Sequence, residues 1–295
     1  MTEFLSVAPQ VLFGQLLVGL INGSFYALLS LGLAVIFGML NIVNMAHGAF
    51  YMLSAFLGWL LLTHTGLGYW WALVLAPLTV AALGIALERC LLRHLYRLDP
   101  LYSLLFTFGI ALILEGAFRH YFGVSGQAYP IPELLKGGHN LGFMFLPTYR
   151  AWVVVFSMAV CFGTWYAIER TRLGAYLRAA TENPTLVQVF GINVPVMISL
   201  TYALGVGLAG LAGVLAAPIY QVSPLMGSNI IIVVFAVVVI GGMGSILGSI
   251  LAGLSLGILE GLTKVYYPEA SNIVVFVVMA LVLMVKPTGL FGKEH

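Results

Sequence analysis

Apolar stretches of helical length, separated by short polar gaps, occupy nearly the whole sequence and restrict the fold more than any other feature. About 20 consecutive apolar residues cross the hydrocarbon core of a bilayer as a helix, so such stretches predict membrane-spanning helices. The composition agrees, because 61% of the residues are hydrophobic and 7% are charged, whereas a soluble domain carries about 25% charge. We therefore expect an all-α fold, a polytopic membrane helical bundle that residues 1–295 form as a single transmembrane domain.

Windows of helical length place about eight apolar segments along the chain, with one or two broken or re-entrant helices among them. Their approximate limits are residues 11–37, 45–63, 69–92, 101–119, 151–168, 195–219, 229–262 and 271–286. The seventh segment is too long for one plain helix, and the glycine-rich residues 241–245 interrupt it. We expect two pieces there that enter and leave by the same face of the membrane.

The basic residues predict the orientation of the chain. Arginines cluster in the gaps after the third and fifth segments: Arg89, Arg93 and Arg97, and then Arg170, Arg172 and Arg178. The positive-inside rule places both gaps in the cytoplasm, which puts the N-terminus on the periplasmic side and the C-terminus in the cytoplasm. No Lys or Arg precedes Arg89, so the first segment lacks the basic start of a cleavable signal and is expected to remain as a spanning helix.

The sequence lacks the residue patterns that are typical of enzyme active sites. The sequence contains no P-loop, and it has no Ser-His-Asp or metal-ligand constellation. Cys90 and Cys161 do not form a CxxC pair, and the net charge of +2 is too small to indicate a nucleic-acid partner. We expect a protein that is not an enzyme and carries no cofactor or metal of its own.

Two interruptions of the apolar pattern are candidates for contact with a transported substrate. Residues 41–48 separate the first two segments, and residues 241–245 divide the seventh. Broken backbone at membrane depth lines cavities or is buried in protein, and the N-terminus of a half-helix there can hold a carboxylate. Candidate pathway residues are Asn22, Tyr26, Asn44, His47, Gly241, Gly242, Gly244 and Ser245. For His47 the alternative is a structural imidazole bonded to a neighbouring carbonyl or amide, and for Asn22 and Tyr26 it is a role as polar residues in helix packing.

Carboxylates inside a membrane are the usual mark of proton or sodium coupling. The nearest candidate is Glu115, toward the outer end of the fourth segment, whereas Glu88, Glu169 and Glu260 lie at segment ends and indicate anchors. An ion-gradient-driven carrier or a channel would need Glu115, and this alternative stays open. Small residues recur every four positions, for example in the series that starts at Gly205. This spacing predicts close helix packing, within this chain or with a second membrane subunit.

Five short motifs, in order along the whole chain, resemble one transporter family. They are residues 19–28 (GLINGSFYAL), 44–48 (NMAHG), 180–184 (ATENP) with 191–193 (GIN), 240–248 (IGGMGSILG) and 286–292 (KPTGLFG). Together they look like the LivH-type permease subunit of bacterial branched-chain amino-acid ABC importers. The resemblance implies an inner-membrane heterodimer with a second related permease subunit, two cytoplasmic ATPases that bind ATP and Mg, and a periplasmic substrate-binding protein.

The resemblance also implies a function for the polar connector at about residues 169–192. In such importers a short cytoplasmic helix of the permease docks on the ATPase, and residues 180–191 match it. Thr181 or Asn183 is expected to cap this helix, Pro184 to lie in its first turn and Gly191 to end it. Leu186, Val187, Val189 and Phe190 are expected to supply apolar contacts. The coupling residues are then Arg178, Thr181, Glu182, Asn183, Leu186, Phe190 and Gly191, and the alternative is an amphipathic helix on the lipid surface.

The implied substrate is an amino acid, and branched-chain leucine, isoleucine and valine are the commonest assignment in the family. Similar permeases also move urea, short amides or aromatic acids. The spanning segments contain no charged pair that would hold a zwitterion tightly. We therefore expect a pathway of low affinity, in which the periplasmic protein sets the specificity.

Overall fold

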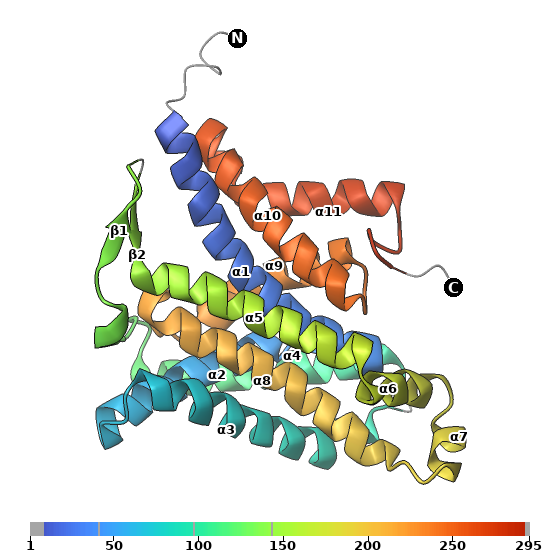
Figure 1. Ribbon diagram of the computed structural model, residues 1–295. Helices are drawn as coiled ribbons and strands as arrows, with labels where there is room; N and C mark the ends of the chain where they lie inside the picture. Colours follow the sequence, from blue (N-terminus) through green and yellow to red (C-terminus); the bar gives the residue numbers. More distant parts are fainter. Residues whose placement is uncertain (1–8, 41, 97, 143, 293–295) are drawn as a thin grey trace. The chain divides into compact units, whose positions relative to one another are not determined.

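The computed structural model describes residues 9–40, 42–96, 98–142 and 144–292 (Figure 1). Asn41 and Arg97, and the side chains of Thr181 and Glu182, lie outside the described residues. Within these ranges the chain is mainly helical, as the apolar segments predict, and the strands β1 and β2 form one short hairpin. The all-α membrane bundle is thus confirmed.

Seven helical spans within the described ranges are long and apolar enough to cross a membrane. They are α1 (Pro9–Leu40), α2 (His47–Leu60) with the π-helical turn η2 (Leu61–Thr65), α3 (Tyr69–Cys90) with the 3-10 turn η3 (Leu92–His94), α4 (Pro100–Phe122), α5 (Thr148–Arg170), α8 (Val194–Tyr220) and α10 (Ile246–Tyr266). Two shorter apolar helices are α9 (Met226–Gly241) and α11 (Val274–Val285).

The remaining elements connect these helices. They are the 3-10 turn η4 (Glu133–Leu135), strands β1 (Gly138–Asn140) and β2 (Phe145–Pro147), helices α6 (Arg172–Glu182) and α7 (Pro184–Val189), and the 3-10 turn η5 (Pro268–Ala270). Strands β1 and β2 form an antiparallel hairpin in which Gly138 pairs with Pro147. The long gap between α4 and α5 is therefore a structured connection and not a plain loop.

The seventh apolar segment is divided, as predicted. Helix α9 ends at Gly241 and α10 begins at Ile246. Gly242 and Gly244 have φ values of +99° and +88°, a left-handed conformation that glycine adopts without steric cost. Ser245 then caps α10, because its Oγ accepts a hydrogen bond from the Gly248 N–H at 3.1 Å. That the two pieces enter and leave by one face stays a prediction.

The described chain divides into two compact units. Among the described residues, unit 1 consists of 9–30, 131–142, 144–161 and 233–292, and unit 2 of 31–40, 42–96, 98–130 and 162–232. The expectation of a single domain stays a prediction.

Close helix packing through small residues is found in each unit. In unit 2, a Cβ added to Gly205 of α8 would lie 2.7 Å from the Gly32 carbonyl oxygen of α1. In unit 1, a Cβ added to Gly19 of α1 would lie 2.5 Å from the Gly257 carbonyl oxygen of α10. Glycine at these positions lets the two backbones approach. The small-residue faces thus serve packing within this chain, the first of the two interpretations offered by the sequence.

Candidate functional site

The polar connector after α5 folds into two short helices, where the sequence suggested one helix over residues 180–191. Helix α6 ends at Glu182, and α7 begins at Pro184. Between them Asn183 is extended, with φ −145° and ψ 85°. The residue before a proline is excluded from the helical region by the proline ring, so Pro184 interrupts the helix and starts the next one.

Asn183 caps α7, which confirms one of the two proposed caps. Its Oδ1 accepts a hydrogen bond from the Leu186 N–H at 3.0 Å. The backbone of Thr181, the other proposed cap, lies within α6, and its side chain lies outside the described residues. Gly191 follows α7 with φ +82° and donates from its N–H to the Gln188 carbonyl at 2.9 Å. It therefore ends the helical turn as predicted.

Three of the four predicted apolar contacts, on α7 and on Phe190 that follows it, are exposed. Leu186 is 53% exposed, Val189 79% and Phe190 75%. Val187 is 6% exposed, so the expectation that it offers a contact surface is wrong. A six-residue helix needs one side chain facing its own protein for support, and Val187 provides this contact.

Arg178 fastens α6 to the end of α5. Its Nη1 donates to the Ile168 carbonyl oxygen at 3.2 Å and lies 3.5 Å from Glu169 Oε2. Gly174 packs so tightly on the Ile168 carbonyl that a Cβ would overlap it. Arg178 therefore holds α6, the start of the connector, against the end of α5.

A buried carboxylate lies in unit 2 where α3 meets α8, the helix that follows α7. Glu88 is 1% exposed and accepts hydrogen bonds from Ser199 Oγ at 2.5 Å and from the Tyr96 hydroxyl at 2.9 Å. Arg89 Nε donates to the same Ser199 oxygen at 3.2 Å. Burial and the Glu88 carboxylate raise the pKa of Tyr96 above its usual range. Sequence reasoning identified Glu88 as an anchor but missed this pair, because Ser199 is distant in sequence.

The break before α2 is well packed. Asn44 Oδ1 accepts from the Ala46 N–H at 3.1 Å, and the Met45 N–H donates to Thr107 Oγ1 of α4 at 3.0 Å. His47 is fully buried, and a Cβ on Gly32 would lie 3.0 Å from its ring carbon Cε1. This burial against α1 favours the structural interpretation of His47. A pathway role for Asn44 and His47 stays a prediction.

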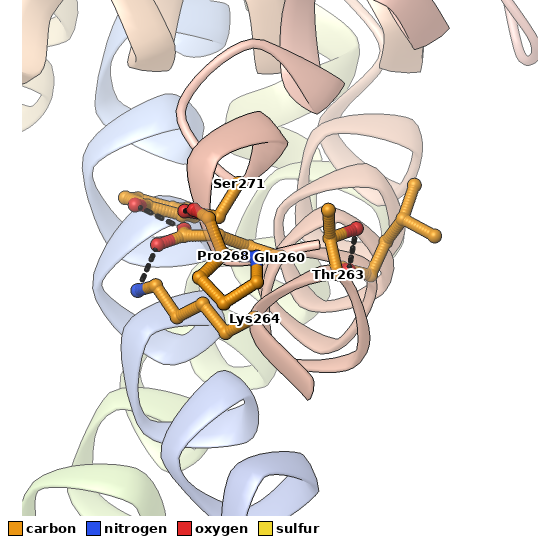
Figure 2. A network of polar contacts seen from close by, with 7 residues as sticks. Glu260, Thr263, Lys264, Pro268 and Ser271 are labelled. Carbon is orange, nitrogen blue, oxygen red and sulfur yellow. Dashed lines mark hydrogen bonds and ion pairs between the residues drawn. The ribbon is translucent and has the colours of Figure 1, made fainter. Parts of the chain in front are cut away.

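Two further pathway candidates, Asn22 and Tyr26, belong to α1 and to unit 1. Asn22 is half-buried. The Tyr26 hydroxyl donates to Glu260 Oε2 of α10 at 2.8 Å, and Lys264 Nζ lies 2.5 Å from Glu260 Oε1. Figure 2 shows Lys264 and Glu260 pointing toward each other. The Tyr26 contact therefore joins α1 to α10, and its place on a pathway is untested.

The glycine-rich break after α9 is covered by the C-terminal motif. The Leu290 N–H donates to the Ile240 carbonyl at 2.8 Å, and the Phe291 N–H donates to the Gly241 carbonyl at 3.1 Å. A Cβ on Gly242 would clash with the backbone of Gly292. Two motifs that the sequence separates thus meet in unit 1. The pathway role of Gly241, Gly242, Gly244 and Ser245 stays a prediction.

Unit 2 contains a pocket of about 170 Å³ bordered by the first turns of α2 and α9. Three segments line it: Met45, Gly48, Ala49 and Met52, then Phe108, Ala111, Leu112 and Glu115, then Pro224, Gly227, Ser228, Ile231 and Ile232. The wall is apolar except at Glu115 and Ser228. Sequence reasoning singled out Glu115 but could not place it beside α2 and α9.

Comparison with known proteins decides the family. The family model described as "Branched-chain amino acid transport system / permease component" matches residues 15–283. The chain belongs to this family. The permease is 31% identical to the high-affinity branched-chain amino acid transport system permease protein LivH of Escherichia coli, over 95% of this chain and 96% of that protein.

Two further relatives extend the comparison. The permease is 32% identical to the corresponding protein BraD of Pseudomonas aeruginosa, over 95% of this chain and 96% of BraD. It is also 28% identical to the E. coli permease protein LivM, over 90% of this chain and 67% of LivM. No solved structure matches the permease. The permease is a multi-pass membrane protein and a component of a transport system, as the resemblance implied.

Proposed function

We propose that the permease forms half of the translocation pathway of an ATP-driven importer for branched-chain amino acids. The observation that carries this proposal is α7, a capped helix outside the membrane spans that exposes Leu186, Val189 and Phe190. An exposed apolar cluster on a short polar connector is costly unless a partner covers it. The chain itself contains no P-loop, so the partner that supplies energy is a separate ATPase.

The proposed assembly has five or more chains. Similarity to both LivH and LivM supports a heterodimer with a second related permease subunit. Two cytoplasmic ATPases bind ATP and Mg, and a periplasmic binding protein delivers the amino acid. The arginine clusters orient α6 and α7 toward the cytoplasm of a bacterial inner membrane.

Coupling is then mechanical. ATP binding brings the two ATPases together. The ATPase on which α7 is docked then moves α7. Arg178 holds α6 on the end of α5, and α8 follows α7 directly. Movement of α7 therefore reaches the membrane helices α5 and α8. Their movement opens the translocation pathway first to the binding protein and then to the cytoplasm.

The test replaces the exposed cluster of α7. In proteoliposomes that contain all subunits, we expect ATP-dependent leucine uptake by the wild type and a large loss in the double variant Leu186→Ala, Phe190→Ala. Truncation of an aromatic contact at an interface centre costs about 2 kcal/mol or more, roughly thirtyfold in affinity. ATPase subunits should also be lost from the purified complex.

The matched control is Val155→Ala on α5, where the side chain is 66% exposed and is expected to face lipid. It should leave uptake and assembly unchanged. Full uptake by a well-inserted α7 double variant would contradict the coupling role. Uptake that persists without ATP and follows an ion gradient would instead support the ion-driven carrier.

A further inference from the structure

The pocket in unit 2 is an apolar cavity with one carboxylate on its wall. Its volume is about 170 Å³, similar to the engineered apolar cavity of ~150 Å³ that holds benzene. Met45, Met52 and Ile231 supply aliphatic surface. A branched aliphatic side chain therefore fits the space.

The two polar side chains on the wall differ in their availability. Ser228 Oγ already donates to the Leu225 carbonyl at 3.0 Å. Glu115 Oε1 is paired with Arg119 at 3.1 Å, and the Arg119 side chain is 48% exposed. Within the described ranges, Glu115 Oε2 has no hydrogen-bonding partner. The carboxylate thus retains an acceptor oxygen for a further cation.

We propose that this pocket is a substrate subsite in which Glu115 receives the ammonium group of an aliphatic α-amino acid. The inference rests on the proposed transport function and assigns its substrate class. The branched side chain lies against Met45, Met52 and Ile231. Because Glu115 acts on the substrate, its presence does not require an ion gradient as the source of energy.

Charge explains why this subsite selects an amino acid over the other candidate cargoes. A carboxylate on an apolar wall is poorly hydrated, and a cation that pairs with it restores much of the lost interaction. Urea and amides bring no charge, and an aromatic acid without an ammonium group brings a carboxylate but no cation to pair with Glu115. Of these cargoes, only an amino acid combines an ammonium group with an aliphatic side chain.

The first experiment uses the complete importer in proteoliposomes. We expect Glu115→Gln to lower leucine uptake about tenfold or more, since a hydrogen bond to a charged group is lost. ATP hydrolysis stimulated by the binding protein should remain at the wild-type level, because coupling through α7 is intact. The control Glu269→Gln removes an exposed carboxylate of η5 and should leave uptake unchanged.

The second experiment measures occupancy directly and does not depend on the folding of the Glu115 variant. In the complete importer with Cys90→Ser and Cys161→Ala, the change Ala111→Cys places a thiol on the pocket wall. Leucine should slow alkylation of this thiol by a maleimide. Isocaproate, which has the carbon skeleton of leucine without the ammonium group, should not.

The outcomes separate the two proposals. Absence of ATP-dependent leucine uptake by the wild type would overturn the proposed function. Wild-type uptake that Glu115→Gln leaves intact would overturn the subsite alone. Equal protection of Ala111→Cys by leucine and isocaproate, or protection by neither, would also overturn the subsite.

Discussion

At the residue scale, the buried Glu88 shows how one carboxylate can serve structure in a chain with few charges. Two hydroxyl groups, those of Ser199 and Tyr96, donate to its two oxygens. A buried polar group stabilises a fold only when it is satisfied, and each donor here depends on the same acceptor. Glu88 therefore links α3 to the start of α8, next to the proposed coupling helix.

Removal of this carboxylate should be costly. We expect Glu88→Ala to lower the free energy of unfolding by about 1–3 kcal/mol, because it leaves the buried Ser199 hydroxyl and the partly buried Tyr96 hydroxyl without their acceptor. Glu88→Gln keeps an acceptor oxygen and should cost less. Thermal unfolding of the purified chain in detergent measures both. Glu133, whose side chain is 85% exposed, is the control, and an equal loss from Glu133→Ala would contradict the assignment.

At the scale of the element, α7 depends on its cap. It has six residues, and helices shorter than ~12 residues are marginal without support. The Asn183 side chain and buried Val187 provide that support. The sequence predicted a cap at Thr181 or Asn183 and a stop at Gly191, because these are local signals, but it could not tell which apolar side chain of α7 turns inward.

Loss of the cap should loosen α7 and weaken coupling. We expect Asn183→Ala to destabilise this helix by about 0.5–2 kcal/mol and to speed hydrogen exchange over residues 184–190. Asn183→Ser retains a capping oxygen and should behave like the wild type. Exchange rates of α7 that are identical in the alanine variant and the wild type would show that the cap is dispensable.

At the scale of the whole molecule, glycine contacts bring helices together inside each unit. Gly257 of α10 packs so closely on Gly23 of α1 that a Cβ would overlap its backbone. Gly116 of α4 has open space around it. Since lipid tails are as apolar as the helix faces, such close van der Waals packing is a main source of association between membrane helices.

The contrast between the two glycines is testable. We expect Gly257→Ala to destabilise the chain by about 1–3 kcal/mol, because the added methyl forces the backbones apart. Gly116→Ala should be neutral or slightly stabilising, since alanine is the better helix former. Unfolding temperatures of the two variants in the same detergent provide the measurement. The interpretation fails if Gly257→Ala unfolds at the wild-type temperature.

The sequence by itself determined the membrane helices, the family, the division of the seventh segment and the Gly191 stop after α7. Apolar length, glycine, proline and capping residues act on their neighbours along the chain, so their effects can be predicted locally. Only the tertiary structure decided that Ser199 meets Glu88, that the C-terminal motif covers the break after α9, and that Glu115 lies on the pocket wall. These contacts join residues far apart in sequence, and side-chain packing selects them.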